Sequence, residues 1–138
     1  MGHYEYFEHT ADLGIISEGS TYPETVEYAA RALFNQICST EKMSCTQTIH
    51  LKVQSDTPED RAVQFLNQLL LQFVISGFVP IKYNLRESEA DNLDAVLEGD
   101  TFDPDRDESY QEIKAVTYHQ LRLDITPTGY RLQLVADL

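Results

Sequence analysis

The clearest helical signal in this chain lies in residues 21–38, TYPETVEYAARALFNQIC. Thr21 can cap the first turn, Pro23 is tolerated there because no N–H is needed, and Glu24 completes a capping box. Apolar residues then recur at helical spacing and form one stripe: Val26, Ala29, Ala30, Leu33, Phe34, Ile37 and Cys38. This pattern predicts an amphipathic helix that packs on a core.

A second helix is predicted to begin near Asp56-Thr57-Pro58, and Gly77 is placed to end it. Phe65, Leu71 and Ile75 widen its apolar surface, so we expect this helix to be covered on more than one side. Its main stripe consists of Ala62, Val63, Leu66, Leu69, Leu70, Phe73 and Val74.

Strands are predicted where apolar and polar residues alternate. These segments are Tyr4 to His9, Leu13 to Glu18, Ile49 to Val53, Leu93 to Leu97, Ala115 to Ile125 and Tyr130 to Ala136. We therefore expect a single α+β domain over residues 1–138, a two-layer domain with a mainly antiparallel sheet and two helices on one face.

The formal charge of −13 is unevenly spread along the chain. Between residues 87 and 112 the only basic residue is Arg106. Phosphate binding draws on clustered Lys and Arg, so strong direct binding to nucleic acid is not expected. An acidic surface suits cations or a basic protein partner, although the run can equally be a solvated face. Its acidic members are Glu87, Glu89, Asp91, Asp94, Glu98, Asp100, Asp103, Asp105, Asp107, Glu108 and Glu112.

The chain is expected to be soluble and cytoplasmic. Its longest apolar stretch, Leu69 to Val74, is interrupted by Gln72 and is far shorter than the roughly 20 residues of a membrane span. No basic region followed by an apolar run is visible at the N-terminus. Cys38 lies on the stripe of the first helix, where it is expected to pack as a small hydrophobe.

Templates for common enzymes are missing from the sequence, which lacks GxSxG, Walker, HExxH and GxGxxG motifs. What remains is Glu8-His9-Thr10-Ala11-Asp12, which puts two carboxylates and an imidazole at the end of a strand. This group fits an oxygen-rich cation site. It fits strand-end capping by Asp12 and a packed or solvated His9 equally well.

The C-terminus adds oxygen ligands at the end of a predicted hairpin. If residues 126–129 form its turn, Ile125 lies near Tyr130, and the same register places Tyr118 near Asp137. His119, Asp137 and the terminal carboxylate of Leu138 would then share one end of the sheet. Such hard oxygen ligands favour Ca²⁺ or Mg²⁺ over zinc. An ordinary edge strand with polar residues at its end remains an open alternative.

Several dispersed segments together resemble the archease family. Residues 4–15, YEYFEHTADLGI, closely resemble the opening of that family, with its EHTAD-like signature. Residues 28–34 and 65–70 are similar to its two helices, residues 112–119, EIKAVTYH, match its IKAVTYH block, and Asp137-Leu138 resembles its ending. The matches occur in the family's order and cover nearly the whole chain.

The resemblance implies a role as an activator, and not as an enzyme. Members of the family act as cofactors of the RtcB-type tRNA-splicing ligase, promoting its guanylylation and multiple turnover. By resemblance, Asp12, Asp137 and the C-terminal Leu138 are the metal ligands, with Ca²⁺ expected and Mg²⁺ or Mn²⁺ as alternatives. Lys114 is tied to activation, and we expect His9 and His119 to contact the partner.

Three positions depart from the family's usual residues. Phe65 and Gln68 stand where Trp and Glu are usual in the second helix, so any role of that acidic position is lost or shifted. Asp107 stands near the place where a His often precedes the IKAVTYH block. That position can still bind a cation, but it offers a carboxylate in place of an imidazole.

Two other functions are compatible with the residues. One is a metal-dependent hydrolase in which Asp12 and Asp137 hold the metal and His9 or His119 acts as the general base. The other is a general chaperone-like module, which would need an exposed apolar patch.

Overall fold

The computed structural model describes residues 2–9, 12–89 and 91–138, and of Glu8 and His9 it describes the backbone alone. Within this part of the chain the elements follow in the order β1 (His3–His9), β2 (Asp12–Gly19), α1 (Tyr22–Ile37), β3 (Gln47–Gln54), α2 (Pro58–Ser76), β4 (Phe78–Ser88), β5 (Asn92–Thr101), β6 (Ala115–Thr126) and β7 (Gly129–Asp137).

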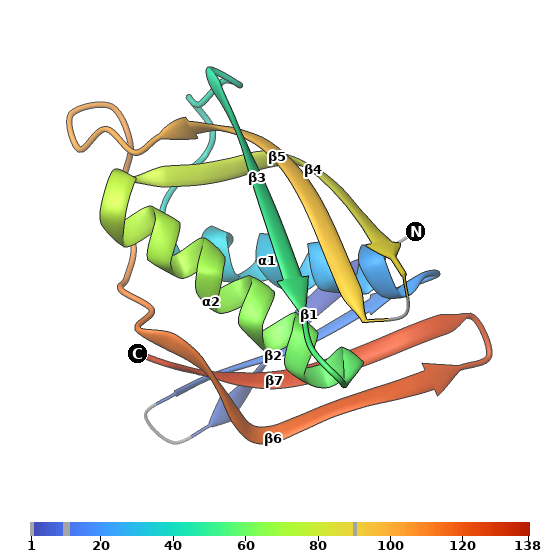
Figure 1. The fold of residues 1–138 in the computed structure, drawn as a ribbon. Coiled ribbons are helices and arrows are strands. Elements are labelled where there is room, and N and C mark those ends of the chain that lie inside the picture. Colours follow the sequence, from blue (N-terminus) through green and yellow to red (C-terminus); the bar gives the residue numbers. More distant parts are fainter. Residues whose placement is uncertain (1, 10–11, 90) are drawn as a thin grey trace.

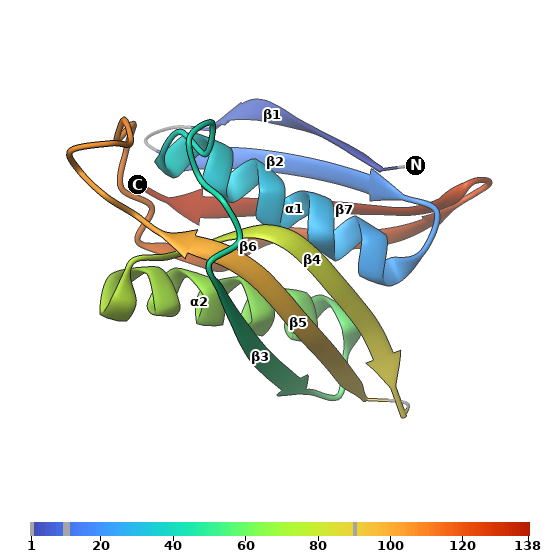
Figure 2. The ribbon, with the colours of Figure 1, turned by 90° about the horizontal axis from the view of Figure 1, so that it is seen from above.

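The strands form two antiparallel sheets, and the two helices lie between them (Figures 1 and 2). One sheet has the order β1-β2-β7-β6, and the other has the order β3-β5-β4. Helix α1 packs on β2 and also reaches β4, while α2 packs on β6 and on β3. The predicted α+β class, with antiparallel strands and two helices, is confirmed. The division of the strands into two sheets was not predicted, and it arises because each helix buries apolar side chains against both sheets.

The helix ends follow the predicted capping chemistry. The Thr21 hydroxyl accepts a hydrogen bond from the backbone N–H of Glu24, and the Thr57 hydroxyl accepts one from Asp60. Gly77 ends α2 in the left-handed conformation, with φ at 75°, which glycine adopts without a steric penalty. None of the described helices combines the length and the apolar character needed to cross a membrane.

Helix α2 is covered along only part of its length. Phe65 is fully buried, as the widened stripe predicts. In contrast, Leu71, Val74 and Ile75 are 54%, 77% and 69% exposed. The expectation that α2 is covered on more than one side is therefore wrong for its last turns, where the described elements leave the outer face open.

The β6–β7 hairpin changes register partway along its length. Ile125 pairs with Tyr130, as the predicted turn requires, but the pairing shifts between Arg122 and Thr117. Gln120, inside this bulge, has a φ of 54°. The Tyr118 hydroxyl donates a hydrogen bond to the Asp60 carboxylate at the start of α2, which draws the bulged segment toward the helix.

The N-terminal end of β6 is held by Asn67, a side chain of α2. The Asn67 amide donates to the carbonyl of Val116 at 3.0 Å, and the Val116 N–H donates to Asn67 Oδ1 at 2.8 Å. Because β6 is an edge strand, these bonds satisfy backbone groups that no neighbouring strand pairs. Asn67 thus fixes the position at which β6 enters the sheet.

We expect Asn67→Ala to lower the free energy of unfolding by about 1–3 kcal/mol, because it leaves the Val116 N–H and carbonyl without their partner. Urea denaturation followed by circular dichroism measures the effect. Gln68→Ala, which removes an amide side chain at the next helical position, serves as the control. Equal losses for the two variants would contradict a special role for Asn67.

Candidate metal site at the end of the four-stranded sheet

Residues from both ends of the chain form one row across the four-stranded sheet. Asp12 on β2 pairs with His9 on β1 and with Asp137 on β7, and Asp137 pairs in turn with Ala115 on β6. The C-terminus lies at this same end of the sheet (Figure 1). Residues far apart in the sequence, Asp12 and Asp137, are therefore direct neighbours.

The two aspartates lie on the face of the sheet that points away from the helices. Leu13 and Ala136, which follow and precede them on the same strands, pack in the core. Alternation along a strand therefore places Asp12 and Asp137 on the opposite face. Directly opposite residues of an antiparallel pair have Cβ atoms about 4.5–5.5 Å apart, so both carboxylates can reach one small ion.

This arrangement fits a hard divalent cation. Like charges placed directly opposite each other on a sheet are destabilising, and a shared cation removes that repulsion. Carboxylate oxygens are also the ligands that Ca²⁺ and Mg²⁺ prefer. Asp137 is exposed and Asp12 is partly exposed, so an ion can reach the pair from solvent.

Side chains alone do not complete a metal site among the described residues. Over the side chains of residues 2–7, 12–89 and 91–138, no group of three or more His, Cys, Asp and Glu is gathered closely enough to hold a metal. The side chain of His9, named as a candidate from the sequence, lies outside the described part. The described side chains supply no third ligand close to the Asp12–Asp137 pair. Leu138, the third ligand that the resemblance implies, directly follows Asp137.

Lys114 is attached to the acidic pair through the backbone. Its N–H donates to the carbonyl oxygen of Asp137 at 2.8 Å, which extends the β6–β7 pairing by one bond. Its side chain is exposed and lines a groove beside α2. The structure thus brings three of the candidates, Asp12, Asp137 and Lys114, to the same end of the sheet.

The backbone register around His119 differs from the predicted hairpin register. The unshifted hairpin register predicts Tyr118 opposite Asp137, but the bulge puts Ala115 there instead. His119 lies inside the bulge, exposed, with its N–H donating to the Thr117 hydroxyl at 3.3 Å. The predicted pairing of Tyr118 with Asp137 is therefore wrong, because the bulge shifts β6 against β7.

Asp107 is bound by the guanidinium of Arg106, a contact that was not predicted from the sequence. Arg106 donates to Asp107 from Nε at 2.9 Å and from Nη2 at 2.8 Å, and its Nη1 lies 3.4 Å from Asp100 Oδ2. Asp100 also accepts bonds from the backbone N–H groups of Ser44 and Thr101. Two members of the acidic run are thus buried parts of a structural network and not a solvated face.

These contacts lower the pKa of both carboxyl groups. The hydrogen bonds from Arg106 hold the pKa of Asp107 below its ordinary value, and the N–H of Ser44 does most to lower that of Asp100. Burial has the opposite effect on Cys38, raising the pKa of its thiol to about 11. Cys38 is 1% exposed, as expected of a small hydrophobe, and an exposed Cys45 is not bonded to it.

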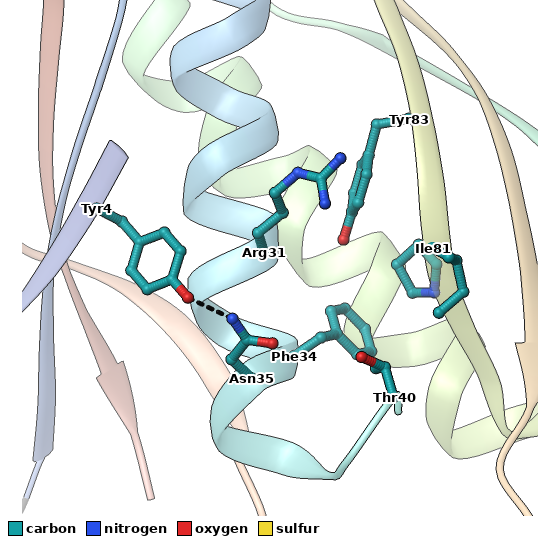
Figure 3. A pocket seen from close by; sticks show the side chains of 8 residues that line it. Tyr4, Arg31, Phe34, Asn35, Thr40, Ile81 and Tyr83 are labelled. Carbon is teal, nitrogen blue, oxygen red and sulfur yellow. Dashed lines mark hydrogen bonds between the residues drawn. The ribbon is translucent and has the colours of Figure 1, made fainter. Parts of the chain in front are cut away.

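A cavity of about 280 Å³ lies between β1, α1 and β4 (Figure 3). The Arg31 guanidinium lies 4.7 Å from the centre of the Tyr83 ring and 2.9 Å from Glu27, while Asn35 donates to the hydroxyl of Tyr4. Arg31 is thus already neutralised. We interpret this cavity as a packing gap where α1 contacts β1 and β4, the edge strands of the two sheets.

Comparison with known proteins identifies a family over almost the whole chain. The sequence model of the archease protein family (MTH1598/TM1083) matches residues 4–138. The protein archease of Methanosarcina mazei is 37% identical over 139 residues, which cover 98% of this chain and 95% of that protein. The protein archease of Pyrococcus furiosus is 34% identical, with both chains fully covered.

Solved structures share the fold. The solution structure of Methanobacterium thermoautotrophicum protein 1598 has a TM-score of 0.83 and 22% identity, with 98% of both chains covered. The crystal structure of an archease from Thermotoga maritima, described as a possible chaperone, has a TM-score of 0.69 and 24% identity, covering 96% of this chain and 94% of that one.

We expect Asp137→Asn to leave stability unchanged or raise it in the presence of a chelator, by up to about 1 kcal/mol, because the like-charge pair is removed. Added Ca²⁺ should raise the melting temperature of the wild-type protein and not that of the variant. Glu41→Gln, which removes one exposed negative charge elsewhere, is the control and should keep the full Ca²⁺ response. Equal Ca²⁺ responses in Asp137→Asn and the wild type would contradict the site.

A second prediction concerns Asp107. A carboxyl whose pKa is lowered in the folded state stabilises the protein above its unfolded pKa, about 3.9, and that stabilisation disappears as the pH falls through the folded pKa. Asp107→Asn should therefore be less stable than the wild type at about pH 7, and the gap should close in acid. Urea titrations over this range measure it, with exposed Asp105→Asn as control. A gap that persists unchanged in acid would contradict the ionic role of Asp107.

Proposed function

Because this chain belongs to the archease family, we propose that it activates an RtcB-type RNA ligase by way of a divalent cation held where its two ends meet. The observation that carries this proposal is the direct pairing of Asp12 with Asp137 across β2 and β7. The pair concentrates negative charge at one end of the four-stranded sheet, on its two inner strands. Such a negative charge can hold a divalent cation next to a partner whose reaction depends on metal ions.

The cation would be held by Asp12, Asp137 and the terminal carboxylate of Leu138, with Ca²⁺ the expected ion and Mg²⁺ or Mn²⁺ as alternatives. When bound, the cation supplies a positive charge at the surface that attracts oxygen ligands. Asp12 and Asp137 orient that centre because the β2–β7 pairing holds their backbones. The backbone N–H of Lys114 donates to the Asp137 carbonyl, which holds the Lys114 backbone next to the end of β7.

The partner would be the intracellular tRNA-splicing ligase, whose guanylylation and multiple turnover this protein would promote. Lys114 and His119 are both exposed, which leaves them available for contact with that enzyme. His9, next to Asp12 in the row, is proposed as a further contact. The protein itself does not need to grip RNA, since its net charge of −13 opposes phosphate binding.

The test uses the purified ligase with broken tRNA and GTP, with this protein added in substoichiometric amounts. We expect the wild-type protein to stimulate repeated turnover. Asp12→Asn and Asp137→Asn should each lower the stimulated rate about tenfold or more, equivalent to about 1.4 kcal/mol. Lys114→Ala should also reduce it, while metal binding to the pair is retained.

Glu41→Gln is the matched control and should stimulate like the wild type. A version with residues added after Leu138 should lose metal binding as well as stimulation, because the terminal carboxylate moves away. Full stimulation by both aspartate variants would refute the proposed mechanism. Suppression of aggregation of unrelated unfolded proteins, without any effect on the ligase, would favour a general chaperone instead.

A further inference from the structure

A groove of about 370 Å³ lies beside the C-terminal half of α2. Phe73 and Val74 of the helix form one wall, and the segment leading into β6, with Ile113 and Lys114, forms the other. In Figure 1 this segment descends along the end of α2 toward the C-terminus. The groove therefore runs from the open end of the helix to the metal-site end of the sheet.

The helix face bordering this groove is unusually apolar for a surface. From Gln64 to Ser76 the sequence contains no charged residue. Within this stretch Leu71, Val74 and Ile75 are all more than half exposed. Solvated helix faces normally carry charged side chains, so a contiguous apolar patch of this kind indicates a surface that another molecule covers.

The surroundings of the patch are negatively charged. Glu112 lines the groove together with one basic residue, Lys114, and Glu108, Asp105 and Asp103 are exposed in the loop that precedes it. The C-terminal end of α2 adds the negative pole of its dipole, and its last turn has no basic residue. An occupant of the groove must therefore combine apolar side chains with flanking positive charge.

A second copy of this chain does not meet that requirement. Each copy carries a formal charge of −13, so two acidic rims would face each other. An RNA-joining enzyme meets it well, because a protein that binds phosphates must present Lys and Arg on its surface. Apolar side chains of the partner would enter the groove, and its basic residues would pair with the rim.

We propose that the ligase docks on this groove through an amphipathic segment that carries apolar anchors and flanking Lys or Arg. This inference rests on the proposed function, since it takes the ligase as the partner. The backbone hydrogen bond from Lys114 to Asp137 connects a wall of the groove to strand β7. Docking in the groove therefore takes place next to the end of β7, the strand that carries Asp137.

The test measures the affinity of the purified ligase for this protein, together with stimulated turnover. The variant Val74→Gln with Ile75→Gln removes apolar surface at exposed positions and should keep the fold, as circular dichroism can verify. Its affinity for the ligase should fall about tenfold or more, and turnover should recover at saturating concentrations. Ile125→Gln, at an 83% exposed residue at the far end of β6, is the matched control and should bind normally.

A second arm tests the charged rim. Glu112→Lys should weaken binding and reduce its dependence on salt, whereas Glu41→Lys should change neither by a comparable amount. Normal binding by both groove variants, with stimulation by the wild type intact, would overturn the docking site and leave the proposed function standing. Absence of any stimulation or binding by the wild-type protein would overturn both. A wild-type dimer that the Val74 and Ile75 changes convert to monomer would identify the groove as a self-interface and overturn the inference.

Discussion

The pairing of β2 with β7 is the constraint on which the rest of the molecule depends. It joins the second strand of the chain to the last one, and β1 and β6 then add to either side. The continuous register from Asp12↔Asp137 to Gly19↔Tyr130 fixes which side chains face the helices. A slip of β2 by one residue would turn Ile15 outward and Asp12 toward the core, so burial of the apolar face enforces the position of Asp12 beside Asp137.

The two parts of helix α2 have different surroundings: the first contacts β6, and the last is exposed to solvent. Its first turns are anchored to the sheet by Asp60, which holds Tyr118 in the bulge, and by Asn67, which holds Val116. Its last turns expose apolar side chains to solvent. The same rigid element thus sets where β6 starts, and with it Lys114, and also provides the adjoining surface.

Local chemistry made much of this fold predictable. Thr21, Thr57 and Gly77 mark helix ends because caps act over a few residues, and strand alternation survives in either sheet. The meeting of Asp12 with Asp137 followed from the family resemblance, while the residues alone left it open. The bulge could not be foreseen, because it depends on Tyr118 reaching Asp60 across the fold. The burial of Asp107 was not predicted, although its partner Arg106 is the neighbouring residue, because Arg106 also has to reach Asp100 on β5.

The strand order also has a consequence for how the protein is made. In the sheet β1-β2-β7-β6, strand β7 lies inside, yet it follows both of its neighbours in the chain. During synthesis on the ribosome, β1 and β2 can form a hairpin early, but β2 and β6 cannot share a sheet until β7 has emerged. A nascent or prematurely terminated chain therefore lacks the central joint of this sheet. A chain that stops before β7 cannot bring Asp137 beside Asp12.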